Sequence, residues 1–139
     1  MTAALVLDCS AACSLCFEDE GAEPCDQLLA VLESGLAVVP ALFFWEVANV
    51  LLMAERRQRL SRAERVEALQ LLEGLGCETD PVKPAVIWHD VIHLADQCSL
   101  TSYDADDPEL AMRRGLPLAS FDRALLATAR SLGVGLVLG

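Results

Sequence analysis

The chain has 139 residues, of which 54% are hydrophobic, and a mean hydropathy of +0.40. These values exclude a disordered chain and predict one domain over residues 1–139. No apolar run reaches the roughly 18 residues of a membrane span, and the chain reaches Asp8 too soon for a signal peptide. We therefore expect a cytoplasmic protein without a membrane partner. The net charge of -11 argues against a basic surface for nucleic acid and favours a basic protein partner or bound cations.

The first half of the chain alternates between strands and helices. An apolar run at residues 4–7 predicts a strand buried on both faces, which ends at Asp8. A short helix capped by Ser10 follows, and then a polar loop over residues 18–24. A helix over residues 25–33 precedes a second strand, Leu36–Val39.

A helical hairpin is predicted next. One helix spans residues 41–57, and a second runs from Ser61 to about residue 73, with Ser61 and Glu64 in the spacing of a capping box. Five arginines crowd into residues 56–65, and we interpret them as a solvated face.

The second half of the chain continues the alternation. Further short strands are predicted over residues 77–80, 116–119 and 136–138. Further helices are predicted over residues 84–98, from Asp107 to Gly115, and from Asp122 to Gly133, with a polar break at 99–107. This order predicts an α/β fold with a parallel sheet between helices.

Acidic residues occupy positions that suggest a metal site. Asp8 and Asp122 follow predicted strands, whose carboxyl ends open into one crevice in α/β sheets. Glu46 lies at the edge of an apolar helical stripe, where a carboxylate is costly unless it is paired or metal-bound. Asp104 precedes a predicted helix, whose dipole tolerates an anion. Oxygen-only ligands favour Mg²⁺ or Mn²⁺, and a water of such an ion can be deprotonated to attack phosphorus.

Structural roles remain open for each of these acids. Asp8 and Asp122 also suit helix caps, and Asp104 and Asp106 suit turns. Two other motifs favour structural roles. His89 and His93 have the spacing of zinc ligands but lack the glutamate of the zinc-protease motif. The six cysteines include one CxxC pair without a second pair or a nearby histidine, which favours reduced, buried thiols.

Four segments resemble PIN-domain nucleases, specifically the VapC-type toxins of bacterial toxin–antitoxin pairs. They are VLDCSA around Asp8, PALFFWEVANVLL around Glu46, LTSYDA around Asp104 and RRGLPLASFDRALLATARSLGV around Asp122. Their order and spacing match along essentially the whole chain. The resemblance implies a three-layer α/β/α sandwich with a mostly parallel sheet and Mg²⁺- or Mn²⁺-dependent endoribonuclease activity. It also implies a homodimer and a VapB-type antitoxin that blocks the site.

By this resemblance, the catalytic and metal-binding residues are Asp8, Glu46, Asp104 and Asp122. Ser120 and Asn49 would support them. The sequence departs from the family where a helix with an aromatic residue and a leucine is usual, because it continues as Asp106-Asp107-Pro108. We expect Pro108 to delay the helix and leave Asp104 in a loop, and we regard Asp106 and Asp107 as additional candidates for the metal shell.

Other functions are considered beside the nuclease. A phosphatase with a strand-end aspartate needs a second aspartate two residues later, which Asp8-Cys9-Ser10 lacks. A phospho-receiver domain needs a lysine at a strand end, and the only lysine, Lys83, precedes a predicted helix. A catalytically inert PIN-like binding module stays open because of the changed segment after Asp104.

Overall fold

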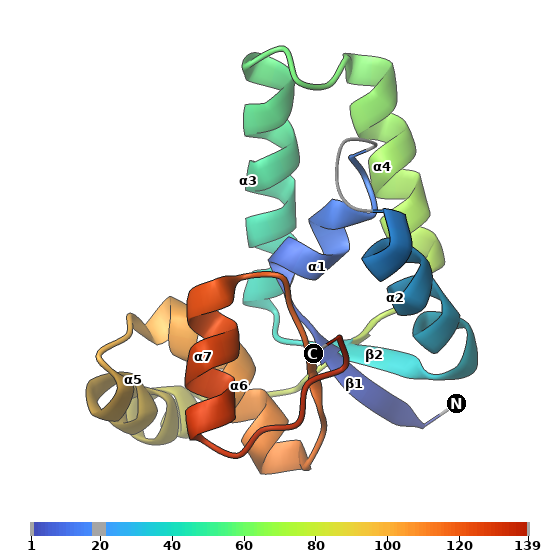
Figure 1. Cartoon of the computed structure of the whole chain (residues 1–139). Helices are drawn as coiled ribbons and strands as arrows, with labels where there is room; N and C mark the ends of the chain where they lie inside the picture. The colour runs from blue at the N-terminus through green and yellow to red at the C-terminus, as the bar shows by residue number, and fades with distance from the viewer. Residues whose placement is uncertain (1, 18–21, 139) are drawn as a thin grey trace.

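The computed structural model describes residues 2–17 and 22–138, and its centre is a sheet of four parallel strands (Figure 1). The strands lie in the order β3-β2-β1-β4. They are β1 (Ala3–Leu7), β2 (Leu36–Val39), β3 (Glu78–Thr79) and β4 (Leu118–Ala119). Val6 pairs with Val38 on one side and with Leu118 on the other, so β1 is central. Parallel strands require crossover connections, and helices supply all three.

Alternate side chains of β1 enter two separate cores. Leu5 and Leu7 pack on one face, and Val6 packs on the other, each with 0% exposure. The first face is covered by α1 (Cys9–Ser14), α2 (Ala22–Ser34), α3 (Leu42–Arg56) and α4 (Arg62–Gly74). The second face is covered by α6 (Ser102–Arg114) and α7 (Arg123–Ser131). This arrangement confirms the predicted α/β/α sandwich and the strand buried on both faces.

One helical unit lies beyond the second face. The π-helix η1 (Val86–Val91) continues directly into α5 (Ile92–Cys98). Val91 and Ala95 pack against Ala105 of α6 in a small third core. Within the described residues, no helix combines the length and the apolar character that crossing a membrane requires.

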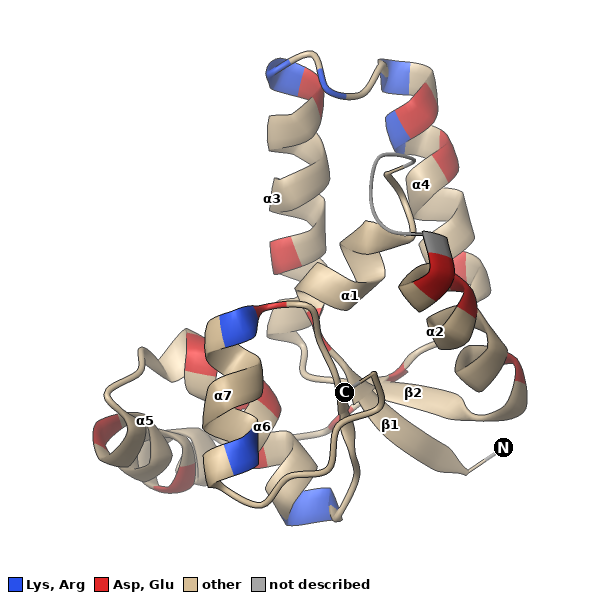
Figure 2. Cartoon of the chain, viewed as in Figure 1, with Lys and Arg blue, Asp and Glu red and all other residues tan. Residues whose placement is uncertain are grey.

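Helices α3 and α4 form a hairpin that projects away from the sheet (Figure 1). The predicted capping box starts α4: Glu64 N donates to Ser61 Oγ at 3.1 Å, and Ser61 N donates to Glu64 Oε1 at 2.9 Å. Basic residues gather at the far end of the hairpin (Figure 2). There Glu55 pairs with Arg65 and lies 3.9 Å from Arg62, so part of the arginine cluster stabilises the hairpin itself.

Two early helix starts differ from the prediction. Helix α1 is capped by Asp8 rather than by Ser10, because Ala11 N donates to Asp8 Oδ1 at 2.8 Å. Helix α2 begins at Ala22, so Pro24 lies in its first turn, where its missing N–H breaks no helical hydrogen bond. The remainder of the predicted polar loop, residues 18–21, lies outside the described residues.

The prediction for α6 was wrong. The helix begins at Ser102 and is capped by Thr101, whose Oγ1 accepts from Asp104 N at 3.1 Å. Asp104 therefore lies in the first helical turn and not in a loop. Pro108 is inside the helix, where its ring nitrogen cannot donate to the carbonyl of Asp104. Burial of Pro108 below 2% exposure, together with Leu110, offsets that loss.

The predicted last strand over residues 136–138 is reduced to an isolated bridge between Leu136 and Leu118. All six cysteines are free thiols, and Cys13 is buried. The Sγ atoms of Cys9 and Cys13 lie 3.7 Å apart. Burial raises the pKa of Cys16 to about 11, which keeps this thiol protonated at neutral pH.

Candidate active site

A cleft of about 260 Å³ lies at the carboxyl end of β1 and is lined by residues of α1, α3, α6 and α7. The four acids that the resemblance assigns as metal ligands all line it, and so does Asp107, one of the two additional candidates. The acidic lining residues are Asp8, Glu46, Asp104, Asp107 and Asp122. No lysine or arginine is found among the described residues that line the cleft. The fold therefore concentrates negative charge that its own basic side chains leave unbalanced at this point.

Asp8 is held in place by three hydrogen-bond donors. Ser120 Oγ donates to Asp8 Oδ2 at 2.5 Å, and Ser10 Oγ lies 2.8 Å from Oδ1. The backbone N–H of Ala11 donates to Oδ1 at 2.8 Å. Burial raises the pKa of Asp8, the three donors oppose that effect, and the charge of Asp122 adds to it.

The same two hydroxyls also fix the loop that follows β4. Phe121 N donates to Ser10 Oγ at 2.9 Å, and Asp122 N donates to Ser120 Oγ at 3.0 Å. The Asp122 carboxylate caps α7 by accepting from two backbone N–H groups at 3.0 and 3.2 Å. These contacts hold Asp122 at the same cleft as Asp8, as expected for acids that follow neighbouring parallel strands. The sequence pattern indicated Ser10 only as a cap, and its link to this loop was missed.

Glu46 projects from α3 beside the buried side chain of Val47. It is half-buried and reaches the cleft, where burial and then the charges of Asp8, Asp106 and Asp104 raise its pKa to about 7. A glutamate in this environment binds a proton far more readily than an exposed one. The cleft without a cation therefore favours the neutral form of Glu46 up to almost neutral pH.

Helix α6 contributes two acids to the cleft, three residues apart and therefore on one helical face. Asp104 is exposed, whereas Asp107 is only 8% exposed. Among the described residues, Oδ1 of Asp107 is buried without a hydrogen-bond partner. Burial, and then the charges of Asp8 and Glu46, raise the pKa of Asp107 well above its ordinary value.

Three predicted residues do not line the cleft: Ser120, which contacts Asp8, and Asn49 and Asp106. Asn49 is exposed on α3. Asp106 is half-buried, and burial and then the charges of Glu109 and Asp80 raise its pKa to about 6, while Arg113 lowers it. Asp106 therefore lies within reach of a separate charged cluster.

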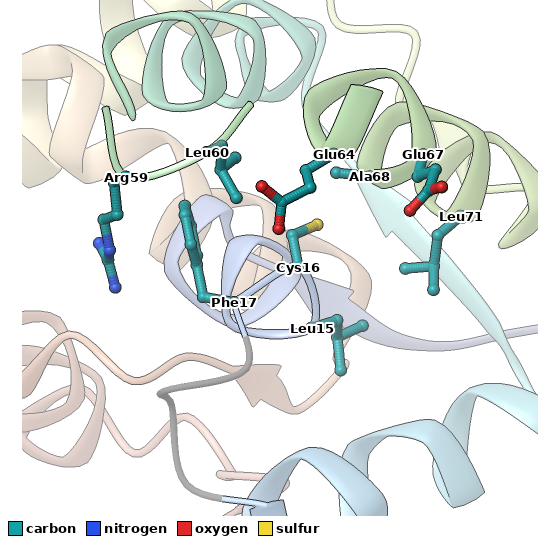
Figure 3. Close-up of a pocket in the computed structure, with 9 residues that line it drawn as sticks. All are labelled: Leu15, Cys16, Phe17, Arg59, Leu60, Glu64, Glu67, Ala68 and Leu71. Carbon is teal, nitrogen blue, oxygen red and sulfur yellow. The ribbon is translucent and has the colours of Figure 1, made fainter. Parts of the chain in front are cut away.

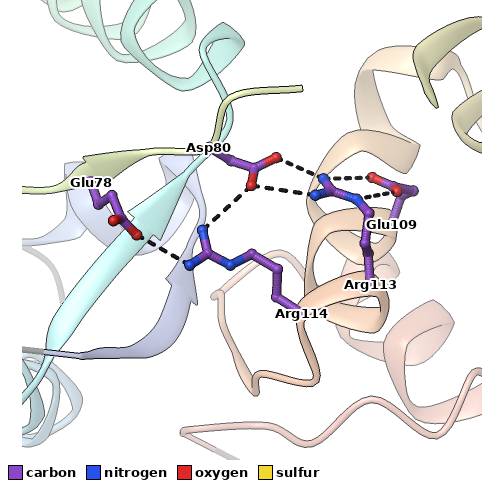
Figure 4. Close-up of polar contacts among 5 residues, drawn as sticks. All are labelled: Glu78, Asp80, Glu109, Arg113 and Arg114. Carbon is purple, nitrogen blue, oxygen red and sulfur yellow. Dashed lines mark hydrogen bonds and ion pairs between the residues drawn. The ribbon is translucent and has the colours of Figure 1, made fainter. Parts of the chain in front are cut away.

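That charged cluster joins the segment after β3 to α6 (Figure 4). Arg113 donates to Asp80 at 2.7 Å and to Glu109 at 2.7 Å, while Arg114 contacts Asp80 at 3.4 Å and Glu78 at 3.2 Å. Asp80 is 5% exposed and Glu109 is 6% exposed, so both need these partners. The cluster occupies both arginines at the end of α6 with acids outside the cleft. No sequence pattern had indicated it.

A larger hollow of about 530 Å³ lies elsewhere, between α1 and α4 (Figure 3). Its lining mixes apolar residues such as Leu15 and Leu71 with Glu64, which the capping box already holds. Arg59 stacks over the ring of Phe17 at 4.0 Å from the centroid. The described lining of this hollow contains two glutamates, Glu64 and Glu67, against five acids in the smaller cleft, so the smaller cleft is the better candidate for chemistry.

The donor set of the smaller cleft fits a hard divalent cation. Its acidic donors are all carboxylate oxygens, which Mg²⁺ and Mn²⁺ prefer, and one of them is a buried oxygen without a partner. Within the described residues, no three His, Cys, Asp or Glu side chains already surround one point in a metal-binding arrangement. Repulsion between carboxylates opposes such an arrangement until a cation supplies the opposite charge.

Fold and cleft together define a parallel α/β protein with an acidic site at the carboxyl end of its central strand. The model of the PIN domain matches residues 5–137, and the chain belongs to the PIN domain family, a family of nucleases. This membership confirms the resemblance seen in the sequence.

Two solved structures share the fold. PAE2754 from Pyrobaculum aerophilum aligns over 97% of this chain and 84% of its own, with a TM-score of 0.73 and 24% identity. FitAcB from Neisseria gonorrhoeae aligns over 95% of both chains, with a TM-score of 0.58 and 17% identity. Comparison with curated proteins finds no match to this chain.

We predict that the metal-free protein loses stability as the pH rises from about 5 to 8. The pKa of Glu46 is about 7 in the folded chain against an ordinary value of 4.5. Protonation of Glu46 therefore stabilises the fold fully below the ordinary value, and that contribution is lost as the pH rises through about 7. With a discount for its partial exposure, the change is about 1–2 kcal/mol.

Urea unfolding in EDTA at several pH values measures this effect. Glu46→Gln cannot titrate, so its stability should vary less with pH and exceed that of the wild type at pH about 8. Equal pH dependence in the two proteins would show that the titration of Glu46 does not cause the loss of stability.

Proposed function

We propose that this chain is a metal-dependent endoribonuclease that hydrolyses RNA phosphodiester bonds. The observation that carries the proposal is the gathering of five acidic side chains in one cleft lined by no described basic side chain. Membership in a nuclease family supports phosphodiester hydrolysis. A phosphatase or phospho-receiver mechanism through Asp8 has no such support.

The proposed roles follow from the positions of the acids. Asp8, Glu46, Asp104 and Asp122 would hold Mg²⁺ or Mn²⁺, which supplies charge stabilisation and lowers the pKa of a water. The chain itself supplies orientation. Ser120 and Ser10 fix the Asp8 carboxylate, and the cap of α7 fixes Asp122.

The rim of the cleft supports a single-stranded substrate. Tyr103 lines the cleft and is 66% exposed, as a stacking platform for an unpaired base would be. The net charge of -11 opposes general attraction to phosphates. Binding would therefore depend on cations in the cleft and on stacking, which favours RNA loops and ends over duplexes.

Cleavage of structured RNAs by the purified protein tests the activity. We expect cuts with Mg²⁺ or Mn²⁺ and none with EDTA. Asp8→Asn and Glu46→Gln should each lower the rate by about 100-fold or more, since a catalytic metal supplies several kcal/mol. Asp26→Asn, which removes an exposed charge on α2 away from the cleft, is the matched control and should leave the rate unchanged.

The alternative is an inert PIN-like binding module. RNA that binds to the wild type but stays intact with every divalent ion would favour that module over the enzyme. Cleavage that persists in Glu46→Gln at the wild-type rate would point to a contaminating nuclease.

We further propose that the chain is the VapC-type toxin of a toxin–antitoxin pair, with a VapB-type antitoxin as its partner. An acidic cleft without basic side chains in its described lining is suited to an arginine from such a partner. A guanidinium can pair with carboxylates in bidentate fashion and so replace the charge of the metal.

Growth after induction tests the toxin role. Wild type and Asp26→Asn should arrest growth, and Glu46→Gln at the same soluble level should not, because it lacks a metal-ligand charge while its shape is nearly unchanged. Arrest by all three proteins would separate toxicity from the acidic cleft and favour a binding-only mechanism.

A homodimer is the assembly that we propose. Large apolar side chains are exposed on α3 and η1, including Trp45 at 77% and Trp88 at 67%. Exposed apolar surface of this kind marks interaction sites in soluble proteins. Sedimentation at micromolar concentration should give twice the 15.0 kDa chain mass, and Trp45→Glu should shift the equilibrium toward the monomer. A wild-type mass of one chain would rule out the dimer under these conditions.

A further inference from the structure

We infer that Asp107, at the floor of the cleft, is a direct ligand for the divalent cation. The inference rests on the proposed metal-dependent function and adds a ligand that the family resemblance does not supply. Four observations carry it: the burial of this side chain, its orphaned oxygen, the acids around it, and its place on α6.

The buried carboxylate of Asp107 needs a hydrogen-bond or ion partner. The side chain lines the cleft, and the residue is 8% exposed. Its Oδ1 atom is buried and accepts no hydrogen bond from the described residues. A buried carboxylate oxygen without a partner costs several kcal/mol. A hydrophobic residue at this position would cost less free energy of folding. A ligand outside the chain that binds the Asp107 carboxylate would explain why the acid is present.

The surroundings of Asp107 select a cation as that ligand. Among the charges that raise the pKa of Asp107, those of Asp8 and Glu46 have the largest effect, ahead of Asp106, and all three are negative. Arg113, on the same helix, is engaged by Asp80 and Glu109. No described lysine or arginine lines the cleft. A small divalent ion bound between Asp8, Glu46 and Asp107 would satisfy all three carboxylates.

The start of α6 determines which acids reach this position. Because Thr101 caps the helix, Asp104 lies in the first turn and Asp107 follows three residues later on the same face. Asp104 is exposed at the rim, and Asp107 is buried below it. In this chain, α6 thus supplies an outer and an inner carboxylate to the same cleft.

Titration calorimetry with MnCl₂ on metal-stripped protein tests the inference. Asp107→Asn should weaken Mn²⁺ affinity by at least about tenfold, because loss of even an outer-shell partner costs 10–100-fold. Asp26→Asn, on the surface of α2, should bind Mn²⁺ as the wild type does. Asp107→Ser removes the same charge with a smaller side chain, so it repeats the test if the amide disturbs the cleft.

Thermal unfolding of the same proteins provides the second readout. In EDTA, Asp107→Asn should be at least as stable as the wild type, because it lacks a buried charge. With Mn²⁺, its melting temperature should rise less than that of the wild type. Wild-type Mn²⁺ affinity in both Asp107 variants would overturn the inference and leave the proposed function standing. Absence of Mn²⁺ binding in the wild type would instead overturn the proposed metal site, and Asp107 as a ligand with it.

Discussion

Repulsion between carboxylates in one small cleft is the constraint on which the rest of the site depends. Burial raises the pKa of Asp8, Glu46 and Asp107, and the acids reinforce this effect in one another. The chain relieves part of the cost at Asp8, where Ser10 and Ser120 donate to the carboxylate and also anchor the loop after β4. Those two hydroxyls thus couple the charge of the site to the packing of β1 against β4.

No described lysine or arginine lines the cleft, although Arg123 directly follows Asp122 in the chain. Arg113 and Arg114 bind acids beside β3, and Arg65 binds Glu55 at the far end of the hairpin. These pairs hold the scaffold together around the cleft without neutralising it. Under the proposed function, balance would come from outside the chain, as a divalent ion during catalysis or as an arginine of a bound partner. The proposed enzyme activity and its inhibition would thus depend on the same unpaired charge.

The parts of the fold that follow short-range rules were predictable from the sequence. The apolar run before Asp8 and the acids that follow strands place Asp8 and Asp122 together, because parallel strands share one open end. The contact between Ser10 and the loop around residue 121 spans 111 positions, and no local pattern reports it. The start of α6 was mispredicted because the rule against interior proline was outweighed by the Thr101 cap and the burial of Pro108. The sequence consequently placed Asp107 at the start of the helix and named it, with Asp106, only as an additional candidate for the metal shell, although it is the most deeply buried acid of α6 that reaches the cleft.

The central claim is that this cleft binds a divalent cation through its carboxylates. Anomalous diffraction from crystals grown with MnCl₂ tests it most directly, because manganese is located independently of the protein atoms. We predict an anomalous peak in the cleft that marks a manganese ion. Asp8, Glu46 and Asp107 should coordinate this ion directly. A cleft without a peak at saturating Mn²⁺, with the five acids in their metal-free positions, would contradict the claim.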